Sequence, residues 1–148
     1  MHFELTTEAS PEQVLRALTD FSERRLETWS RTLDPKRYEV REHGDTWAVA
    51  RESTPGSPFW VVARYDWSDP TVVRWTVVES SYGGGGTGSV RISPAAGGSR
   101  LEVTWDYTDI QRRRDKVMMS LIPRFPFRTM IARMWRSALD RYAVEARG

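Results

Sequence analysis

The chain has 148 residues, which is enough for one domain with one hydrophobic core and too few for two. Hydrophobic residues make up 39% of it and aromatic residues 11%, a globular rather than a disordered composition. Because there is no cysteine, disulfides, thiol nucleophiles and thiolate metal ligands are excluded. No stretch reaches the roughly 18 apolar residues of a membrane span, and residues 1–5 do not resemble a signal peptide. We therefore expect a bacterial, cytoplasmic protein with a single domain over residues 1–148.

The net charge of +2 is unevenly distributed. Residues 110–136 contain eight basic residues and one acid, Asp115, so this segment carries +7 and the remainder carries −5. Three interpretations are open: a solvated connector, a lid or element in transient contact with an anionic membrane surface, and a nucleic-acid-binding patch. Nucleic acid is the least favoured, because single strands need exposed stacking aromatics and the aromatic residues here belong to faces predicted to be buried.

The first elements in chain order are a strand and two short helices. Residues 3–7 alternate apolar and polar side chains, as a half-buried strand does. Ser10, Pro11 and Gln13 then give three agreeing signals for the start of a helix: an N-cap, a proline in the first turn and a capping box. A second short helix is expected over residues 22–30.

From residue 38 onward the hydrophobic periodicity changes from helical to two, which predicts strands. Tight turns rich in glycine, proline and aspartate separate them. The expected strands are residues 38–42, 46–52, 59–67, 71–79, 89–93 and 100–107.

Alternation in three of these strands identifies a buried sheet face. In each, one set of alternate positions carries no charge, while the other set carries arginine, aspartate or glutamate. This is typical of an antiparallel sheet with one face in water. Two interpretations of the uncharged set remain, a plain core or a partly polar ligand pocket, and we favour the pocket. The set includes four aromatic side chains with a polar tip: Tyr65, Trp75, Trp105 and Tyr107.

The C-terminal part consists of a basic and apolar connector, residues 109–125, and a long helix over about residues 126–145. Met130 and Met134 lie on the apolar face of the helix, where methionine fills either a core or a ligand wall. The apolar part of the connector is interpreted as a lid over a pocket mouth, with a solubilising linker as the alternative. The lid residues would be Met118, Met119 and Leu121.

This order of elements and two local motifs resemble the START-like (SRPBCC) superfamily, which includes polyketide cyclase/dehydrase-related proteins and the birch-pollen-allergen fold. The first motif is A-S-P-E-Q-V at residues 9–14, followed by L-T-D-F at residues 18–21 and by Trp29. The second is G-G-S-R-L-E-V-T-W at residues 97–105. The resemblance covers essentially the whole chain. It implies an α+β helix-grip fold, in which a curved antiparallel sheet of about seven strands wraps around the long C-terminal helix, with two short helices after the first strand.

The resemblance also implies a function. Members of the superfamily hold lipids, sterols, polyketides or hormones between sheet and helix, so we expect this chain to bind or carry a small hydrophobic, lipid- or polyketide-like ligand there. The alternative is a polyketide cyclase, aromatase or dehydrase acting on a ligand in the same cavity. Of the two, we favour binding without catalysis. No catalytic signature runs through the superfamily, so Tyr65 and Tyr107 are candidates only by their chemistry. The expected ligand-binding residues are Trp29, Tyr65, Trp75, Trp105, Tyr107, Met130 and Met134.

Other chemistries find little support. His2 at the start of the chain and His43 in a predicted turn are expected on the surface, and two such histidines do not make a hydrolytic triad or a histidine-rich metal site. The glycine run at residues 83–86 leads into a strand rather than a helix, which favours a hairpin or a bulged strand entry over a phosphate loop. We therefore expect no metal, nucleotide or other cofactor.

Overall fold

The computed structural model describes residues 1–121, 124 and 126–147. Ile122, Pro123 and Phe125 of the predicted connector lie outside the described residues. Within the described part, the strands and helices have these bounds: β1 (His2–Thr7), α1 (Pro11–Thr19), α2 (Arg24–Thr28), β2 (Glu39–His43), β3 (Trp47–Ser53), β4 (Trp60–Asp66), β5 (Val72–Ser80), β6 (Gly85–Ala95), β7 (Gly98–Thr108), α3 (Arg113–Leu121) and α4 (Phe127–Arg147).

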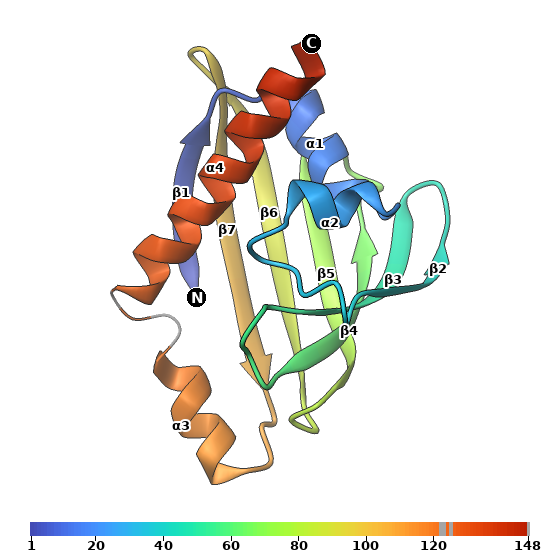
Figure 1. Cartoon of the computed structure of the whole chain (residues 1–148), viewed down its shortest axis with the longest axis vertical. Helices are drawn as coiled ribbons and strands as arrows, with labels where there is room; N and C mark the ends of the chain where they lie inside the picture. The colour runs from blue at the N-terminus through green and yellow to red at the C-terminus, as the bar shows by residue number, and fades with distance from the viewer. Residues whose placement is uncertain (122–123, 125, 148) are drawn as a thin grey trace.

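The strands form one seven-stranded sheet in the order β1-β7-β6-β5-β4-β3-β2, and each neighbouring pair is antiparallel. The helices α1, α2 and α4 lie against one face of this sheet, which we call the inner face (Figure 1). The chain therefore has the expected α+β helix-grip fold: a curved antiparallel sheet, a long C-terminal helix and two short helices after β1. None of the helices in the described ranges is both long and apolar enough to cross a membrane.

The start of α1 is specified by its sequence. The hydroxyl of Ser10 accepts a hydrogen bond from the backbone N–H of Gln13 at 3.2 Å, and Oε1 of Gln13 accepts one from the backbone N–H of Ser10 at 2.9 Å. This is the predicted capping box. Val14, Ala17 and Leu18 then bury one face of α1.

The register of the sheet confirms the predicted inner face. Tyr65 of β4 pairs with Trp75 of β5, and Gly88 of β6 pairs with both Trp75 and Trp105 of β7. Side chains of paired residues point to the same face. Trp105 also stacks on Trp135 of α4, with ring centroids 6.5 Å apart, so this face is the one that the helices cover. A register shifted by one residue would turn all these rings towards water.

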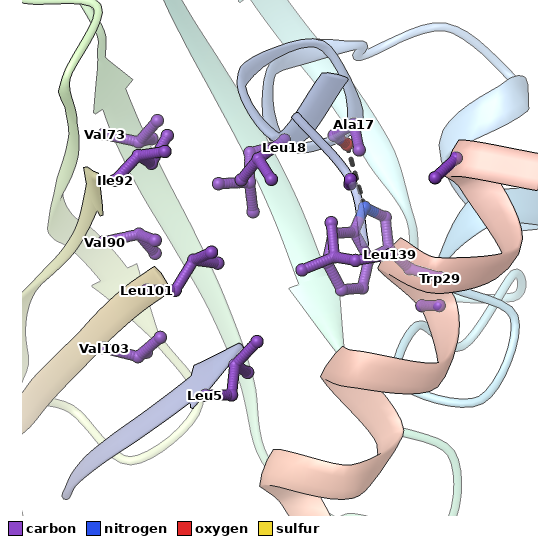
Figure 2. Packing of buried hydrophobic residues seen from close by; sticks show 14 of the residues in the cluster. Leu5, Ala17, Leu18, Trp29, Val73, Val90, Ile92, Leu101, Val103 and Leu139 are labelled. Atoms are coloured by element: carbon purple, nitrogen blue, oxygen red, sulfur yellow. Dashed lines mark hydrogen bonds between the residues drawn. The ribbon is translucent and has the colours of Figure 1, made fainter. Parts of the chain in front are cut away.

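The hydrophobic core lies between the strands and the helices (Figure 2). Leu139 of α4 and Trp29 face Leu5, Leu101 and the neighbouring strand residues in this view. The indole N–H of Trp29 donates a hydrogen bond to the carbonyl oxygen of Ala17 at 2.9 Å, which holds the end of α2 against α1.

The apolar stripe of α4 enters this core along only part of its length. Leu139 and Ala143 are fully buried, whereas Phe127 and Met130 near the start of α4 are 45% and 50% exposed. The inner face of the sheet is therefore packed against α4 at one end and less fully covered at the other.

Two segments differ from the sequence-based expectation. The connector contains a helix, α3, whose central residues include no proline or glycine to prevent one. β6 starts at Gly85, four residues before the predicted start, because part of the glycine run joins the strand. Gly83 adopts a φ of +76° just before it, in the left-handed region that glycine favours. The prediction that this run is a strand entry rather than a phosphate loop is thus confirmed.

Candidate ligand-binding site

Beyond the core, the inner face carries a row of aromatic side chains with a glycine among them. The row runs across four strands as Trp105, Gly88, Trp75 and Tyr65. A Cβ atom at position 88 would overlap the indole ring of Trp75, so this ring lies directly over the glycine. All three aromatic residues are only partly buried. Large rings that lie on the sheet without being enclosed form a wall that a further apolar molecule can contact.

A pocket of about 240 Å³ opens at the end of the sheet that α4 covers less fully, between β1, β7 and α3. Trp105 and Tyr107 line it from β7, and Met119 and Lys116 line it from α3. Met1 and Ile110 complete its apolar lining. The volume lies below the usual range for drug-sized ligands, roughly 300–1,000 Å³, so the pocket suits a small molecule.

The other five predicted ligand-binding residues do not border this pocket: Tyr65 and Trp75 lie further along the aromatic row, and Trp29, Met130 and Met134 lie elsewhere. Trp29 and Met134 border a groove of about 40 Å³ between the end of α2 and α4. Such a volume holds little more than a water molecule or two. Trp29 itself is 4% exposed and belongs to the core. Met130 borders neither this groove nor the pocket beneath α3.

Next to Tyr65, at one end of the aromatic row, lies a buried ion pair between Arg25 of α2 and Glu52 of β3. Nε of Arg25 donates to Oε2 of Glu52 at 2.9 Å, and Nη1 donates to the carbonyl oxygen of Leu18 at 2.8 Å. The hydroxyl of Tyr65 donates a short hydrogen bond to Oε1 of the same carboxylate. The guanidinium lies 4.0 Å from the centre of the Phe21 ring. Phe21 in turn packs against Tyr65, with ring centroids 5.0 Å apart.

This environment fixes the protonation of Tyr65. Burial raises its pKa well above the ordinary value, and the negative charge of Glu52 raises it further, against the opposing effect of Arg25. Tyr65 is therefore neutral near pH 7, and its single proton is already donated. It can accept a hydrogen bond from a ligand, but it has no donor left to offer one.

Tyr107 is in a different situation. Desolvation raises its pKa to about 12, although 36% of the residue is exposed at the pocket. Its ring packs edge-on against Tyr82, with centroids 5.6 Å apart. Among the residues that the structure describes, no group accepts or donates a hydrogen bond at its hydroxyl. Tyr107 therefore has a neutral phenol whose donor remains available to a bound molecule.

Sequence reasoning placed Tyr65, Trp75, Trp105 and Tyr107 on the correct face. It missed Arg25 and Glu52. One signal was available: Glu52 has the same strand parity as Ala48 and Ala50, which are fully buried, so a charge at this position had to find a buried partner. It also did not single out Trp135, whose ring lies 5.1 Å from that of Trp29.

In the described residues, side chains that could bind a metal ion come together at one exposed place. There, potential ligand atoms of His2, Glu4 and Glu102 lie within 4.8 Å of one another. Glu4 already forms an ion pair with Arg100, at 2.5 Å. His2 and His43 are both exposed, as predicted. The expectation that the chain needs no metal stays a prediction.

Comparison with solved structures shows the same fold in three proteins of low sequence identity. A protein of Thermus thermophilus has a TM-score of 0.75 at 16% identity, with 100% of this chain and 99% of that chain covered. The Zhui aromatase/cyclase from a Streptomyces species has a TM-score of 0.72 at 18% identity, covering 98% and 93%. A START superfamily protein from Mycobacterium smegmatis has a TM-score of 0.70 at 11% identity, covering 99% and 97%.

No curated protein sequence matches the chain. The family model described as polyketide cyclase / dehydrase and lipid transport matches residues 2–146, which is almost the entire chain. This match shows that the chain belongs to the polyketide cyclase/dehydrase and lipid transport family.

Proposed function

We propose that the chain binds or carries a small hydrophobic molecule, lipid-like or polyketide-like, on the inner face of the sheet, in the pocket between β7 and α3. One observation carries the proposal: the partly buried ring of Trp105 and the ring of Tyr107, which is 36% exposed, border a pocket of about 240 Å³ instead of filling it. Trp105 connects the two regions, because it stacks on Trp135 of α4 and also lines the pocket. The family description, which includes lipid transport, supports the same function.

The ligand would be held mainly by apolar contact. Trp105 and Tyr107 supply flat aromatic surface, and Met119 of α3 supplies an adaptable thioether on the opposite side. The proposed lid is α3: Met119 is 7% exposed and faces the pocket, whereas Met118 and Leu121 are 41% and 46% exposed. A ligand in this pocket would leave by displacing α3, in which Asp115 and Met119 are the buried residues.

Tryptophan fluorescence tests the proposal directly, because Trp105 lines the pocket. Decanoate and 1-anilinonaphthalene-8-sulfonate are the two probes. Both should quench the emission saturably, and Tyr107→Ala should weaken binding by about tenfold through lost apolar contact. Val78→Ser is the matched control, since Val78 is 60% exposed on β5 and does not border the pocket. Quenching that never saturates, or that Tyr107→Ala leaves unchanged, would count against the pocket. Native mass spectrometry of the purified protein would then identify any molecule that stays bound.

A cyclase, aromatase or dehydrase is the second candidate, and the hydroxyl of Tyr107 favours it. This hydroxyl is a neutral donor in the pocket, suited to hydrogen-bonding a ketone oxygen while the pocket holds a flexible chain in a reactive conformation. With a poly-β-ketone thioester as substrate, Tyr107→Phe should slow cyclisation by about a hundredfold while leaving probe binding intact. Equal rates of cyclisation with and without the protein would leave only the carrier function.

A further inference from the structure

The helix α3 presents apolar side chains on two opposite sides. Met119, with Lys116 and Ser120, lines the pocket on the inner side. Val117 and Leu121 are four residues apart and share the outer side, where they are 58% and 46% exposed. A helix that only covers a core or a pocket needs one apolar face. The second face of α3 therefore calls for a separate explanation.

Further exposed apolar residues lie on α3 and at the start of α4. Met118 is 41% exposed, and Phe127 and Met130 of α4 are 45% and 50% exposed. In Figure 1, α3 and the first turn of α4 follow each other along one side of the molecule, away from α1 and α2. Five large apolar side chains are thus exposed within a short length of chain. Groups of exposed apolar side chains commonly mark binding surfaces.

Positive charge surrounds these apolar side chains. The segment 110–136 carries +7, and its single acid, Asp115, is only 7% exposed, so the exposed charges of this segment are almost all positive. Within the described ranges, six basic residues between positions 112 and 128 take part in no ion pair. All six are exposed: Arg112, Arg113, Arg114, Lys116, Arg124 and Arg128.

We propose that α3 and the first turn of α4 dock on the surface of a membrane that contains anionic lipids. Val117, Met118 and Leu121 would enter the boundary between headgroups and acyl chains, while the arginines contact the lipid phosphates. Amphipathic helices with cationic flanks bind membranes in this way. Nucleic acid fits the charge but not the exposed aliphatic side chains, which have no role against a phosphate backbone. A second copy of the chain fits the apolar residues, but it would bring two cationic surfaces of the same sign together.

Docking at α3 goes beyond ligand binding, because it would set the path by which the ligand reaches the pocket. The pocket lies directly on the inner side of the same helix, with Met119 as its wall. A helix held at the membrane by its outer side would therefore separate the pocket from the lipid phase by only its own width, about 10 Å. A hydrophobic molecule could then pass between bilayer and pocket when α3 is displaced.

Flotation with lipid vesicles tests the inference on the full chain. One set of vesicles is pure phosphatidylcholine and the other contains about a third phosphatidylserine. The protein should float with the anionic vesicles at roughly 0.05 M NaCl and lose most of this binding at roughly 0.5 M NaCl. The variant Val117→Ser/Met118→Ser/Leu121→Ser should bind at least about tenfold more weakly. So should the variant Arg113→Gln/Arg114→Gln/Arg128→Gln, in which no apolar residue changes.

The matched control is Val78→Ser/Val144→Ser, which removes two valines that are 60% and 59% exposed elsewhere on the surface. This variant should float like the unchanged protein. Binding that is equal for both vesicle types, or that the α3 variants retain, would overturn the proposal. So would preferential binding to added duplex DNA, or a dimer that the triple serine variant converts to monomer. Probe quenching in the absence of vesicles reports on the pocket alone. If the unchanged protein does not float with anionic vesicles but its probe quenching is intact, membrane docking is rejected and the proposed function stands.

Discussion

Arg25 and Glu52 are 6% and 7% exposed, and together they connect α2 to β3. Removing a charged group from water costs several kcal/mol, and a buried pair tolerates this only when its geometry and its other hydrogen bonds are good. Here they are: Arg25 also donates to the carbonyl oxygen of Leu18, and Glu52 also accepts from Tyr65. In the described residues no buried side-chain nitrogen or oxygen atom lacks a partner. The pair positions α2 and the Tyr65 ring over the inner face.

Removing one partner of this pair should therefore destabilise the protein strongly. Arg25→Met leaves the carboxylate of Glu52 buried without a counter-charge, and the free energy of unfolding should fall by about 3–5 kcal/mol. The double variant Arg25→Met/Glu52→Leu should recover much of this loss, because both charges are gone. Urea denaturation measures both effects. Arg41→Met, which removes an exposed arginine paired with Glu79, is the control and should change little. A double variant that is no more stable than Arg25→Met would show that the loss comes from packing rather than from the unpaired charge.

At the level of residues, the inner-face aromatics were predictable and the ion pair was not. The orientation of Tyr65 or Trp105 follows from a period of two, which is read from neighbours in the sequence. The partner of Glu52 is 27 residues away on a helix, and only the folded chain brings the two together. The pocket could be expected on the inner face, but its position beneath α3 depends on where the core ends along α4.

At the level of elements, α4 and α3 illustrate two limits of prediction. The long helix was predictable because its apolar stripe recurs over many turns. How far that stripe is buried was not, because this depends on the curvature of the sheet. α3 has nine residues, a length at which an isolated helix is marginal in water, so its sequence alone did not distinguish it from a connector.

The limited burial of α3 leads to a prediction about its dynamics. Of its residues, Asp115 and Met119 are buried, so local opening should cost little free energy. Amide hydrogens of residues 113–121 should exchange faster than those of the core-facing part of α4, residues 134–145, and decanoate should slow this exchange. Met119→Ser should speed probe release without lowering Tm, because Met119 lines the pocket.

The corresponding control is Met118→Ser, measured without vesicles, because Met118 is on the exposed side of α3. Its probe release should match that of the unchanged protein. If both variants release the probe at the same rate as the unchanged protein, α3 is not a lid. If residues 113–121 exchange as slowly as α4, the helix is held by more than its two buried residues.

At the level of the whole molecule, the fold follows from order and periodicity, whereas the choice between carrier and enzyme does not. Both functions use the same sheet, the same long helix and the same pocket, and they differ in whether one hydroxyl reacts with what is bound. That difference lies in the chemistry of Tyr107 and its ligand. Element order and hydrophobic pattern carry no information about it.

Four tyrosines with raised pKa values link global stability to alkaline pH. Burial raises the pKa of Tyr38, Tyr82 and Tyr107 from 10.0 to about 12 and raises that of Tyr65 well above 10.0. A pKa that is higher in the folded state contributes stability that is fully present below the unfolded value and is lost as the pH rises through the folded value. The free energy of unfolding should therefore be steady up to about pH 10 and fall steeply between pH 10 and 12. Lysine titration should add little, because only two of the 22 basic residues are lysine.

Urea midpoints across this range measure the fall, and absorbance at the tyrosinate band shows whether ionisation accompanies unfolding. Tyr107→Phe should make the fall shallower, since one of the four phenols is then absent. Tyrosinate absorbance that develops fully around pH 10 in a protein that is still folded would show that these hydroxyls are in contact with water and that the inner face is more open than its geometry indicates.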